Sequence, residues 1–301
     1  MTNTAMRLDG LFVPLVTPFT DTGELAEAPL ADLAHRVLDQ GADGIVALGT
    51  TGEPATLSAE ERRRVLEICT QVCRERGVPL IVGAGSNSTA DSLRALSALD
   101  SIAAAALVVV PYYTRPSEEG VVEHFRHLAA NSPVPLVIYN VPHRTSRVLS
   151  AETLCRLAEL PNVAGFKHAV GGIDDTTIAF LSRVRSDIAV LSGDDLYAAP
   201  LLALGARGAI LACANVAPAA YADLVAAWRQ GAMERGRELG NRLAPLAAAL
   251  FAEPNPVVIK AVLAARNLIP TAAVRLPLMP AGPASVATAL AAWESIHLAN
   301  H

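Results

Sequence analysis

The two lysines of the chain, Lys167 and Lys260, are the first residues to examine for chemistry, because the other 22 of its 24 basic residues are arginines. Lys167 follows the apolar run 163–166, which is typical of a buried strand. Burial disfavours a charged ammonium, and a neutral amine can attack a carbonyl carbon to form a Schiff base, which an arginine cannot do. This pattern alone is equally compatible with a Schiff-base lysine and with a structural one, either in a buried ion pair or with its ammonium reaching out to solvent.

Hydroxyl groups at other strand ends could support such a lysine. A Schiff base on a keto acid needs a group that moves protons and donors that bind a carboxylate. The phenol of Tyr139 can move protons if neighbouring hydroxyls stabilise its phenolate, and Thr50, Thr51 and Tyr113 could form that relay. The turn 49–52 also offers hydroxyls and backbone N–H groups to a carboxylate, although an ordinary tight turn could have the same sequence.

Charged residues near two further strand ends give weaker evidence for a role in binding. Arg144 follows Tyr139 closely, and its planar guanidinium could bind a second carboxylate, although a surface arginine needs no such role. Asp194 and Asp195 are more typical of a cap on the following helix than of a cation site. The histidines have no carboxylate partners at metal-ligand spacing, so we expect no metal.

Short apolar runs alternate along the chain with longer amphipathic segments, several of which begin with a capping serine. The predicted strands are 11–16, 44–48, 78–84, 105–110, 135–139, 163–167, 188–192 and 208–212. The predicted helices lie near 29–40, 58–76, 89–99, 117–131, 150–159, 173–185, 194–204 and 218–230. Eight strand–helix units in succession predict a (β/α)8 TIM barrel over residues 1–230, whose active site lies at the carboxyl ends of the strands.

Two further points concern the architecture. Residues 231–301 are rich in Ala and Leu and predict an appended C-terminal helical subdomain. A doubly wound open sheet is the alternative to the barrel, but the turn after the first strand, Thr17-Pro18-Phe19, lacks the glycines that cradle a pyrophosphate.

Composition and charge exclude several classes of protein. The 301 residues carry a net charge of −5, and the basic run Arg62-Arg63-Arg64 follows two acidic residues, which indicates a solvated helix face and no nucleic-acid partner. The apolar runs are too short to span a bilayer or to form a signal peptide, so we expect no membrane partner and a cytoplasmic location.

Taken together, these residues resemble the pyruvate-dependent class I aldolases of the dihydrodipicolinate synthase and N-acetylneuraminate lyase family. The resemblance runs from about Gly10 to Pro280 and includes many blocks in the family's order. These blocks are 16–19, 49–57, 111–117, 139–145, 165–167, 192–195, 214–218 and 253–260.

The resemblance implies a catalytic role for four residues. Lys167 would form the Schiff base with pyruvate, and Tyr139 would donate and accept protons. Thr50 and Tyr113 would complete the relay, with Tyr113 reaching across a tight dimer interface. Lys260 also matches the family and needs only a structural role.

The resemblance implies that four further residues bind substrate. Thr51 would bind the pyruvate carboxylate, Ile210 would pack beside the bound pyruvate, and Gly193 belongs to the same group. Arg144 would hold the carboxylate of the incoming aldehyde, aspartate semialdehyde. The reaction implied is the condensation of these two substrates on the diaminopimelate route to lysine, without a cofactor or metal, in a homotetramer built as a dimer of tight dimers.

The sequence departs from the family in two places. His168 stands where synthases more often have an acidic residue, and a changed wall there could admit another aldehyde. Pro54, Ala59 and Arg62 replace residues typical of the lysine-inhibited members, so we do not expect feedback inhibition.

Two alternative functions remain open beside the synthase. One is a lyase or dehydratase that acts on another hydroxy-keto or keto-deoxy acid through the same Lys167. Arg144 argues against it, because a polyhydroxy substrate needs hydroxyl partners at that position. The other is a catalytically silent relative kept for assembly, which the presence of Lys167, Tyr139 and Thr50 disfavours.

Overall fold

The computed structural model describes residues 8–298 of the chain. Eight parallel strands are hydrogen-bonded in chain order and close into a barrel, which confirms the predicted fold class. They are β1 (Gly10–Pro14), β2 (Gly44–Ala47), β3 (Leu80–Gly83), β4 (Ala105–Val109), β5 (Leu136–Asn140), β6 (Val163–His168), β7 (Ala189–Ser192) and β8 (Gly208–Ile210). Continuous burial along most of these strands explains why each appeared in the sequence as an unbroken apolar run.

A helix follows each strand near its predicted position. These helices are α1 (Glu27–Asp39), α2 (Ala59–Arg76), α3 (Thr89–Ser97), α4 (Glu118–Asn131), α6 (Ala151–Ala158), α7 (Asp175–Leu181), α8 (Ala198–Ala203) and α9 (Pro218–Arg229). The serines predicted as caps are confirmed: the side chains of Ser58, Ser117 and Ser150 each accept a backbone N–H of the first turn. A short helix that the sequence did not predict, α5 (Pro142–Thr145), follows β5.

The chain divides into two compact units, which are described separately. One unit comprises residues 8–10 and Ile81–Ile210 and contains strands β4 to β8. The other comprises Leu11–Leu80 and residues 211–298 and contains β2 together with the C-terminal helices. The domain boundary at residue 230 stays a prediction.

In the first unit, the two faces of β6 have different surroundings. Lys167 is paired in register with Tyr139 on β5, whereas the next residue, His168, points to the opposite face because side chains alternate along a strand. On that face Phe166 and Phe180 meet edge to face with ring centroids 5.0 Å apart, which packs α7 against the strand.

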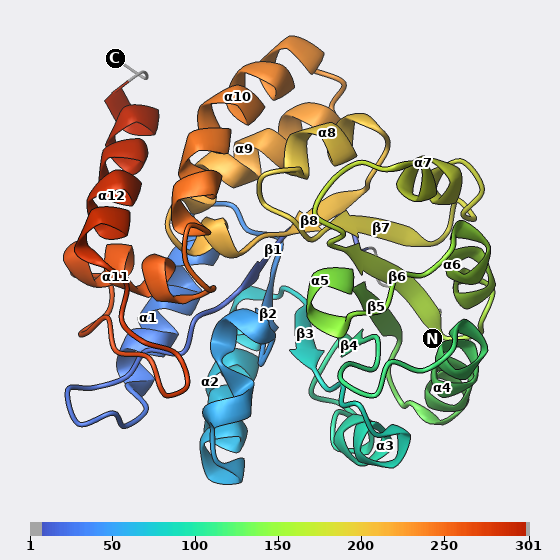
Figure 1. The fold of residues 1–301 in the computed structure, drawn as a ribbon. Coiled ribbons are helices and arrows are strands. Elements are labelled where there is room, and N and C mark those ends of the chain that lie inside the picture. The colour runs from blue at the N-terminus through green and yellow to red at the C-terminus, as the bar shows by residue number, and fades with distance from the viewer. Residues whose placement is uncertain (1–7, 299–301) are drawn as a thin grey trace. The chain divides into compact units, whose positions relative to one another are not determined.

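In the second unit, three helices follow the barrel strands: α10 (Met233–Leu250), α11 (Val257–Ala265) and α12 (Pro283–Leu298). They lie side by side (Figure 1), and the guanidinium carbon of Arg266 stands 3.6 Å from the ring centroid of Trp293 between α11 and α12. This arrangement confirms the predicted helical character of the C-terminal part. No helix within residues 8–298 has the length and apolar character needed to cross a membrane.

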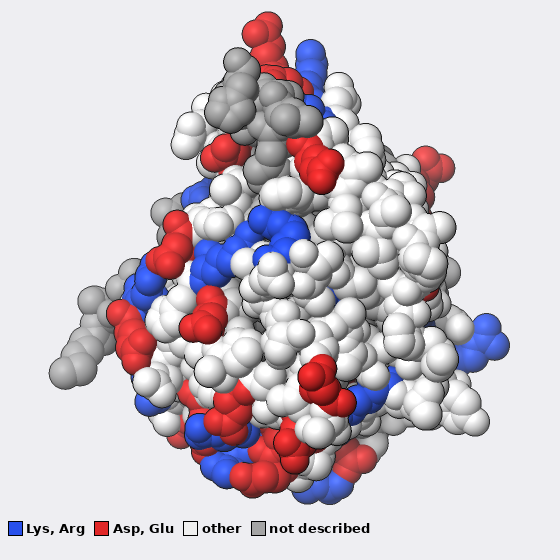
Figure 2. Space-filling model, turned by 90° about the vertical axis from the view of Figure 1, so that its left-hand side faces the viewer, with Lys and Arg blue, Asp and Glu red and all other residues white. Residues whose placement is uncertain are grey.

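The basic run on α2 is a solvated face, as predicted. Arg63 pairs with Glu60 and Glu67, and Arg64 pairs with Glu27, all of them exposed or half-exposed. Basic and acidic side chains are similarly interspersed on the face of the molecule shown in Figure 2, with wide areas that carry neither. The face shown therefore carries charges of both signs.

Candidate active site

Lys167 lies near the carboxyl end of β6 and is only 6% exposed. Its Nζ stands 4.4 Å from the ring centroid of Tyr139, which is 7% exposed on the neighbouring strand β5. The structure therefore brings together a buried amine and a phenol on the same side of the sheet. This is the pair that the sequence predicted to form and protonate a Schiff base.

Gly193, directly after β7, supplies the space that the Lys167 side chain occupies. A Cβ on Gly193 would lie 2.8 Å from Lys167 Cγ and 3.0 Å from its Cε, so no larger residue fits without moving the lysine. The Gly193 N–H donates to the His168 carbonyl oxygen over 2.8 Å, which holds the two strand ends together. Gly193 thus contacts the aliphatic stem of the lysine, a packing role beyond the predicted substrate contact.

Three other predicted residues of this unit lie near further strand ends. Ile210 is the last residue of β8 and is fully buried. Arg144 is exposed on α5, just after β5. Tyr113 follows β4 with a left-handed backbone (φ 67°) and is 86% exposed, so within this chain it stands in solvent rather than beside Lys167.

Asp194 is a charged residue whose role the sequence analysis misjudged. It does not cap α8, because that helix begins at Ala198 after Tyr197 and has no side-chain cap. Instead, Asp194 Oδ2 accepts the Gly171 N–H over 2.7 Å. Burial raises the pKa of this carboxyl, while the Gly171 N–H, His143 and Lys167 act in the opposite direction. A carboxyl group is therefore coupled electrostatically to Lys167.

His143 lies beside Arg144 on α5. Its pKa is lowered mainly by burial and further by the Arg144 charge, whereas Asp194 raises it. Asp194 thus faces charged or titratable groups from both α5 and β6. Each of these residues lies in the last part of a strand or shortly after one, so this grouping could be predicted from the strand ends.

His168 does not line the wall beside Lys167, so the suggested change of that wall is wrong. Its Nε2 lies 3.0 Å from Thr177 Oγ1, and the Thr177 hydroxyl donates to Asp174 over 2.7 Å. Its Nδ1 lies 3.5 Å from Asn140 Nδ2. The imidazole is 2% exposed, and burial lowers its pKa to about 4, partly offset by Asp174. Because side chains alternate along a strand, the sequence of β6 already predicts that His168 lies on the face opposite to Lys167.

The second unit carries the remaining two predicted residues, Thr50 and Thr51, in a single 3₁₀ turn. Thr51 is 2% exposed, and its Oγ1 accepts the side-chain N–H of Asn255 over 3.0 Å. The hydroxyl of Thr17 donates to the carbonyl oxygen of Gly52 over 2.7 Å. The sequence analysis did not identify Asn255 as a partner of this turn, because the two segments lie about 200 residues apart.

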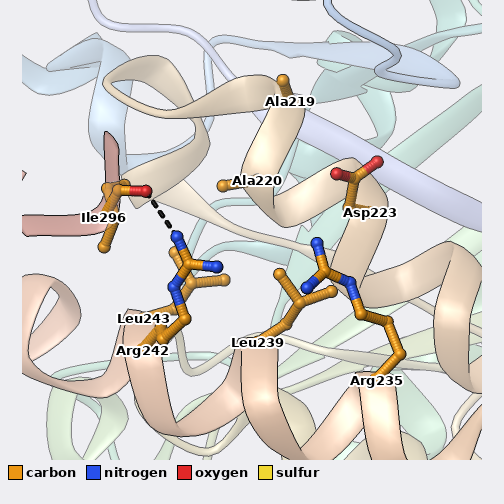
Figure 3. Close-up of a pocket in the computed structure, with 8 residues that line it drawn as sticks. All are labelled: Ala219, Ala220, Asp223, Arg235, Leu239, Arg242, Leu243 and Ile296. Atoms are coloured by element: carbon orange, nitrogen blue, oxygen red, sulfur yellow. Dashed lines mark hydrogen bonds between the residues drawn. The ribbon is translucent and has the colours of Figure 1, made fainter. Parts of the chain in front are cut away.

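A separate surface pocket lies between α9, α10 and α12 of the second unit (Figure 3). Leu239 and Leu243 supply apolar lining, and Asp223 and Arg235 approach from opposite helices. The Arg242 guanidinium donates to the Ile296 carbonyl oxygen over 2.6 Å. None of the eight predicted site residues lines this pocket, so it does not belong to the candidate active site.

Comparison with known proteins identifies the family. The model of the dihydrodipicolinate synthetase family matches residues 7–290. The 4-hydroxy-tetrahydrodipicolinate synthase of Syntrophus aciditrophicus is 45% identical over 271 residues, which cover 89% of this chain and 91% of the relative. That of Neisseria meningitidis serogroup B is 42% identical over 290 residues, covering 95% and 98%.

Solved structures agree with the sequence comparison. The chloride-inhibited dihydrodipicolinate synthase of Acinetobacter baumannii in complex with pyruvate has a TM-score of 0.92 and 37% identity, over 97% of this chain and 99% of the other. A monomeric dihydrodipicolinate synthase variant also has a TM-score of 0.92, with 35% identity over 96% and 97%. Since the family model and the relatives span nearly the whole chain, this protein belongs to the dihydrodipicolinate synthetase family.

Proposed function

We propose that this chain is a 4-hydroxy-tetrahydrodipicolinate synthase, a lyase that forms a carbon–carbon bond by chemistry of the class I aldolase type. It condenses pyruvate, held as a Schiff base on Lys167, with aspartate semialdehyde on the diaminopimelate route to lysine. The observation that carries the proposal is the buried Lys167 amine 4.4 Å from the Tyr139 ring, in a chain whose relatives bear this name. The reaction needs no cofactor or metal.

The first half of the reaction forms a nucleophile from pyruvate. The neutral Lys167 amine attacks the keto carbon, and the resulting carbinolamine loses water to give the imine. The imine then withdraws electrons from the neighbouring methyl group, which loses a proton to give the enamine. Tyr139 donates and accepts the protons of these steps, and we assign the hydroxyl of Thr50 and the partner subunit's Tyr113 to the same relay.

The second half joins the two substrates. The enamine carbon attacks the aldehyde carbon of aspartate semialdehyde, and the new oxyanion takes up a proton. The amine of that substrate then adds to the imine carbon, closes the ring and displaces Lys167, which regenerates the free enzyme. Thr51 binds the pyruvate carboxylate, Ile210 packs beside the pyruvate, and Arg144 holds the carboxylate of the semialdehyde.

The exposure of Tyr113 supports an oligomer. A tyrosine that is 86% exposed after a left-handed turn has no partner for its ring on the surface described here, whereas a neighbouring subunit could use it. We propose a homotetramer built as a dimer of tight dimers, with a cytoplasmic location. Because a monomeric variant is among the similar structures, the molar mass in solution tests this assembly: a tetramer is expected, and a monomer would contradict it.

Borohydride reduction in the presence of pyruvate, followed by peptide mass analysis, tests the first step. An adduct on Lys167 is expected, and its absence would overturn the Schiff-base mechanism. A coupled assay with aspartate semialdehyde against a panel of other aldehydes then tests the substrate. A preference for a keto-deoxy sugar acid in the cleavage direction would favour the lyase alternative.

The role of Arg144 has its own test. Arg144→Ala should weaken the use of aspartate semialdehyde while pyruvate adduct formation stays near the wild-type rate. Arg126→Ala, at an exposed arginine of α4 that pairs with Glu123, is the matched control. Equal loss of both steps in Arg144→Ala would contradict the assigned role.

A further inference from the structure

The second lysine of the chain is buried more deeply than the first. Lys260, on α11, and Glu53, which follows the Thr50–Gly52 turn, form an ion pair of 2.7 Å with side chains 0% and 1% exposed. Burial lowers the pKa of Lys260, while the Glu53 charge acts in the opposite direction. A buried ion pair of this kind needs an explanation, because well-packed apolar residues would often stabilise the fold equally well.

Both oxygens of the Glu53 carboxylate are engaged. Oε1 accepts from Lys260 Nζ, and Oε2 accepts the backbone N–H of Arg275 over 3.1 Å. Lys260 Nζ also lies 4.1 Å from the ring centroid of Phe19, and the Arg275 guanidinium carbon lies 4.2 Å from the same centroid. An arginine in place of Lys260 would offer two parallel N–H donors, which suit a carboxylate with both oxygens available. Because Oε2 of Glu53 already accepts the Arg275 N–H, the single ammonium of a lysine suits this position better.

Glu53 is joined directly to the turn that carries the two predicted threonines. Its backbone is left-handed (φ 53°), and its N–H donates to the Thr50 carbonyl oxygen over 3.2 Å, which closes the turn. Few residues other than glycine adopt this conformation freely, so the carboxylate contacts help to keep Glu53 there. The side chain of Glu53 therefore anchors the exit of the turn.

Residues 255–260, which include Lys260, also contact the Thr50–Gly52 turn at Thr51. Asn255, just before α11, donates to Thr51 Oγ1 over 3.0 Å, and Lys260 lies five residues further along the chain. Asn255, just before α11, thus contacts Thr51, and Lys260 in the N-terminal half of α11 contacts Glu53. One contact holds the Thr51 hydroxyl directly, and the other holds the residue at the exit of the same turn.

We propose that Glu53 and Lys260 are positioning residues, whose buried ion pair orients the Thr50-Thr51 turn for pyruvate. This proposal rests on the proposed function, in which Thr51 binds the pyruvate carboxylate and Thr50 belongs to the proton relay. It assigns to Asn255, just before α11, and to Lys260, within α11, an indirect part in substrate binding. Neither Glu53 nor Lys260 needs to touch the substrate for this role.

The test compares Glu53→Gln, Lys260→Met and the double variant Glu53→Gln/Lys260→Met. Each single variant leaves one buried charge without its partner, so we expect lower resistance to urea. The double variant buries two neutral groups of similar size and should recover that resistance. If the pair positions the turn, kcat/KM for pyruvate in the double variant stays roughly ten- to a hundredfold below wild type, in line with the cost of a small misplacement.

A matched control is Glu27→Gln/Arg64→Met, which removes an exposed ion pair of the same unit and should leave kcat/KM for pyruvate unchanged. Recovery of both urea resistance and kcat/KM in the Glu53/Lys260 double variant would overturn the proposal, since the pair would then be merely structural. If the double variant does not fold, Glu53→Gln decides: an unchanged KM for pyruvate in that variant overturns the proposal, and a raised KM supports it.

Borohydride trapping distinguishes a failure of the positioning role of Glu53 and Lys260 from a failure of the proposed function. An adduct on Lys167 of the wild-type protein upholds the Schiff base whatever the variants do. Without that adduct the proposed function itself fails. With the adduct, equal trapping at low pyruvate in wild type and double variant rejects only the positioning role.

Discussion

Replacement of His168 by glutamine should reduce the decrease in the free energy of unfolding that the protein undergoes in mild acid. His168 is buried, and its pKa lies at about 4 rather than the usual 6.5, because burial disfavours the imidazolium. Below pH 6.5 the unfolded chain therefore binds a proton that the folded chain does not. The free energy of unfolding consequently falls as the pH falls, until the folded state also takes up the proton near pH 4.

The size of the effect follows from the two pKa values. Between pH 7 and pH 5 one such histidine lowers the free energy of unfolding by about 2 kcal/mol. His124 is also buried with a pKa of about 4, caused by burial and by His127, so the pair should account for about 4 kcal/mol. Glutamine at position 168 stays neutral and keeps a donor for the Thr177 hydroxyl.

Urea unfolding at pH 7, 6 and 5 measures this difference. In His168→Gln the loss between pH 7 and pH 5 should be about 2 kcal/mol smaller than in wild type. His35→Gln is the control, since His35 lies half-exposed on α1 beside Glu75 and its replacement leaves both buried histidines in place. The reasoning would be refuted if the free energy of unfolding of His168→Gln fell with pH as steeply as that of wild type. It would also be refuted if His35→Gln showed the same reduced dependence on pH.

Three further predictions concern the first unit, which contains strands β4 to β8. Tyr139→Phe removes the phenolic hydroxyl beside Lys167 and should lower kcat by about 10²- to 10⁴-fold in the coupled assay, with native circular dichroism. Gly193→Ala places a methyl group against Lys167 and should slow borohydride trapping of pyruvate, whereas Gly172→Ala, where a Cβ meets nothing within 4 Å, should not. Phe180→Ala empties a fully buried site beside Phe166 and should cost about 3–5 kcal/mol in urea unfolding. Ile178→Ala, at a side chain 46% exposed on the same helix, should cost far less.

The sequence predicted the barrel well because its strands are short, buried on both faces and separated by helices with serine caps. Those features are local, so they can be read from neighbouring residues. The same local reading put Lys167 and Tyr139 at strand ends, and the register of β5 against β6 then brings them together.

The errors come from contacts that are not local. Asp194 was interpreted as a helix cap, but its partner is the N–H of Gly171, more than twenty residues earlier. The Glu53–Lys260 pair joins residues 207 positions apart, and no periodic pattern links them. The short helix α5 was missed because four residues are too few to establish a helical period.

The burial of both lysines has a practical consequence for chemical labelling. Lys167 and Lys260 are 6% and 0% exposed, so the described surface offers amine-reactive reagents no readily accessible lysine side chain. A lysine introduced at an exposed arginine such as Arg126 would therefore be the favoured lysine for attaching a fluorophore or a solid support. Within residues 8–298, such a variant would present one exposed lysine side chain at a chosen position.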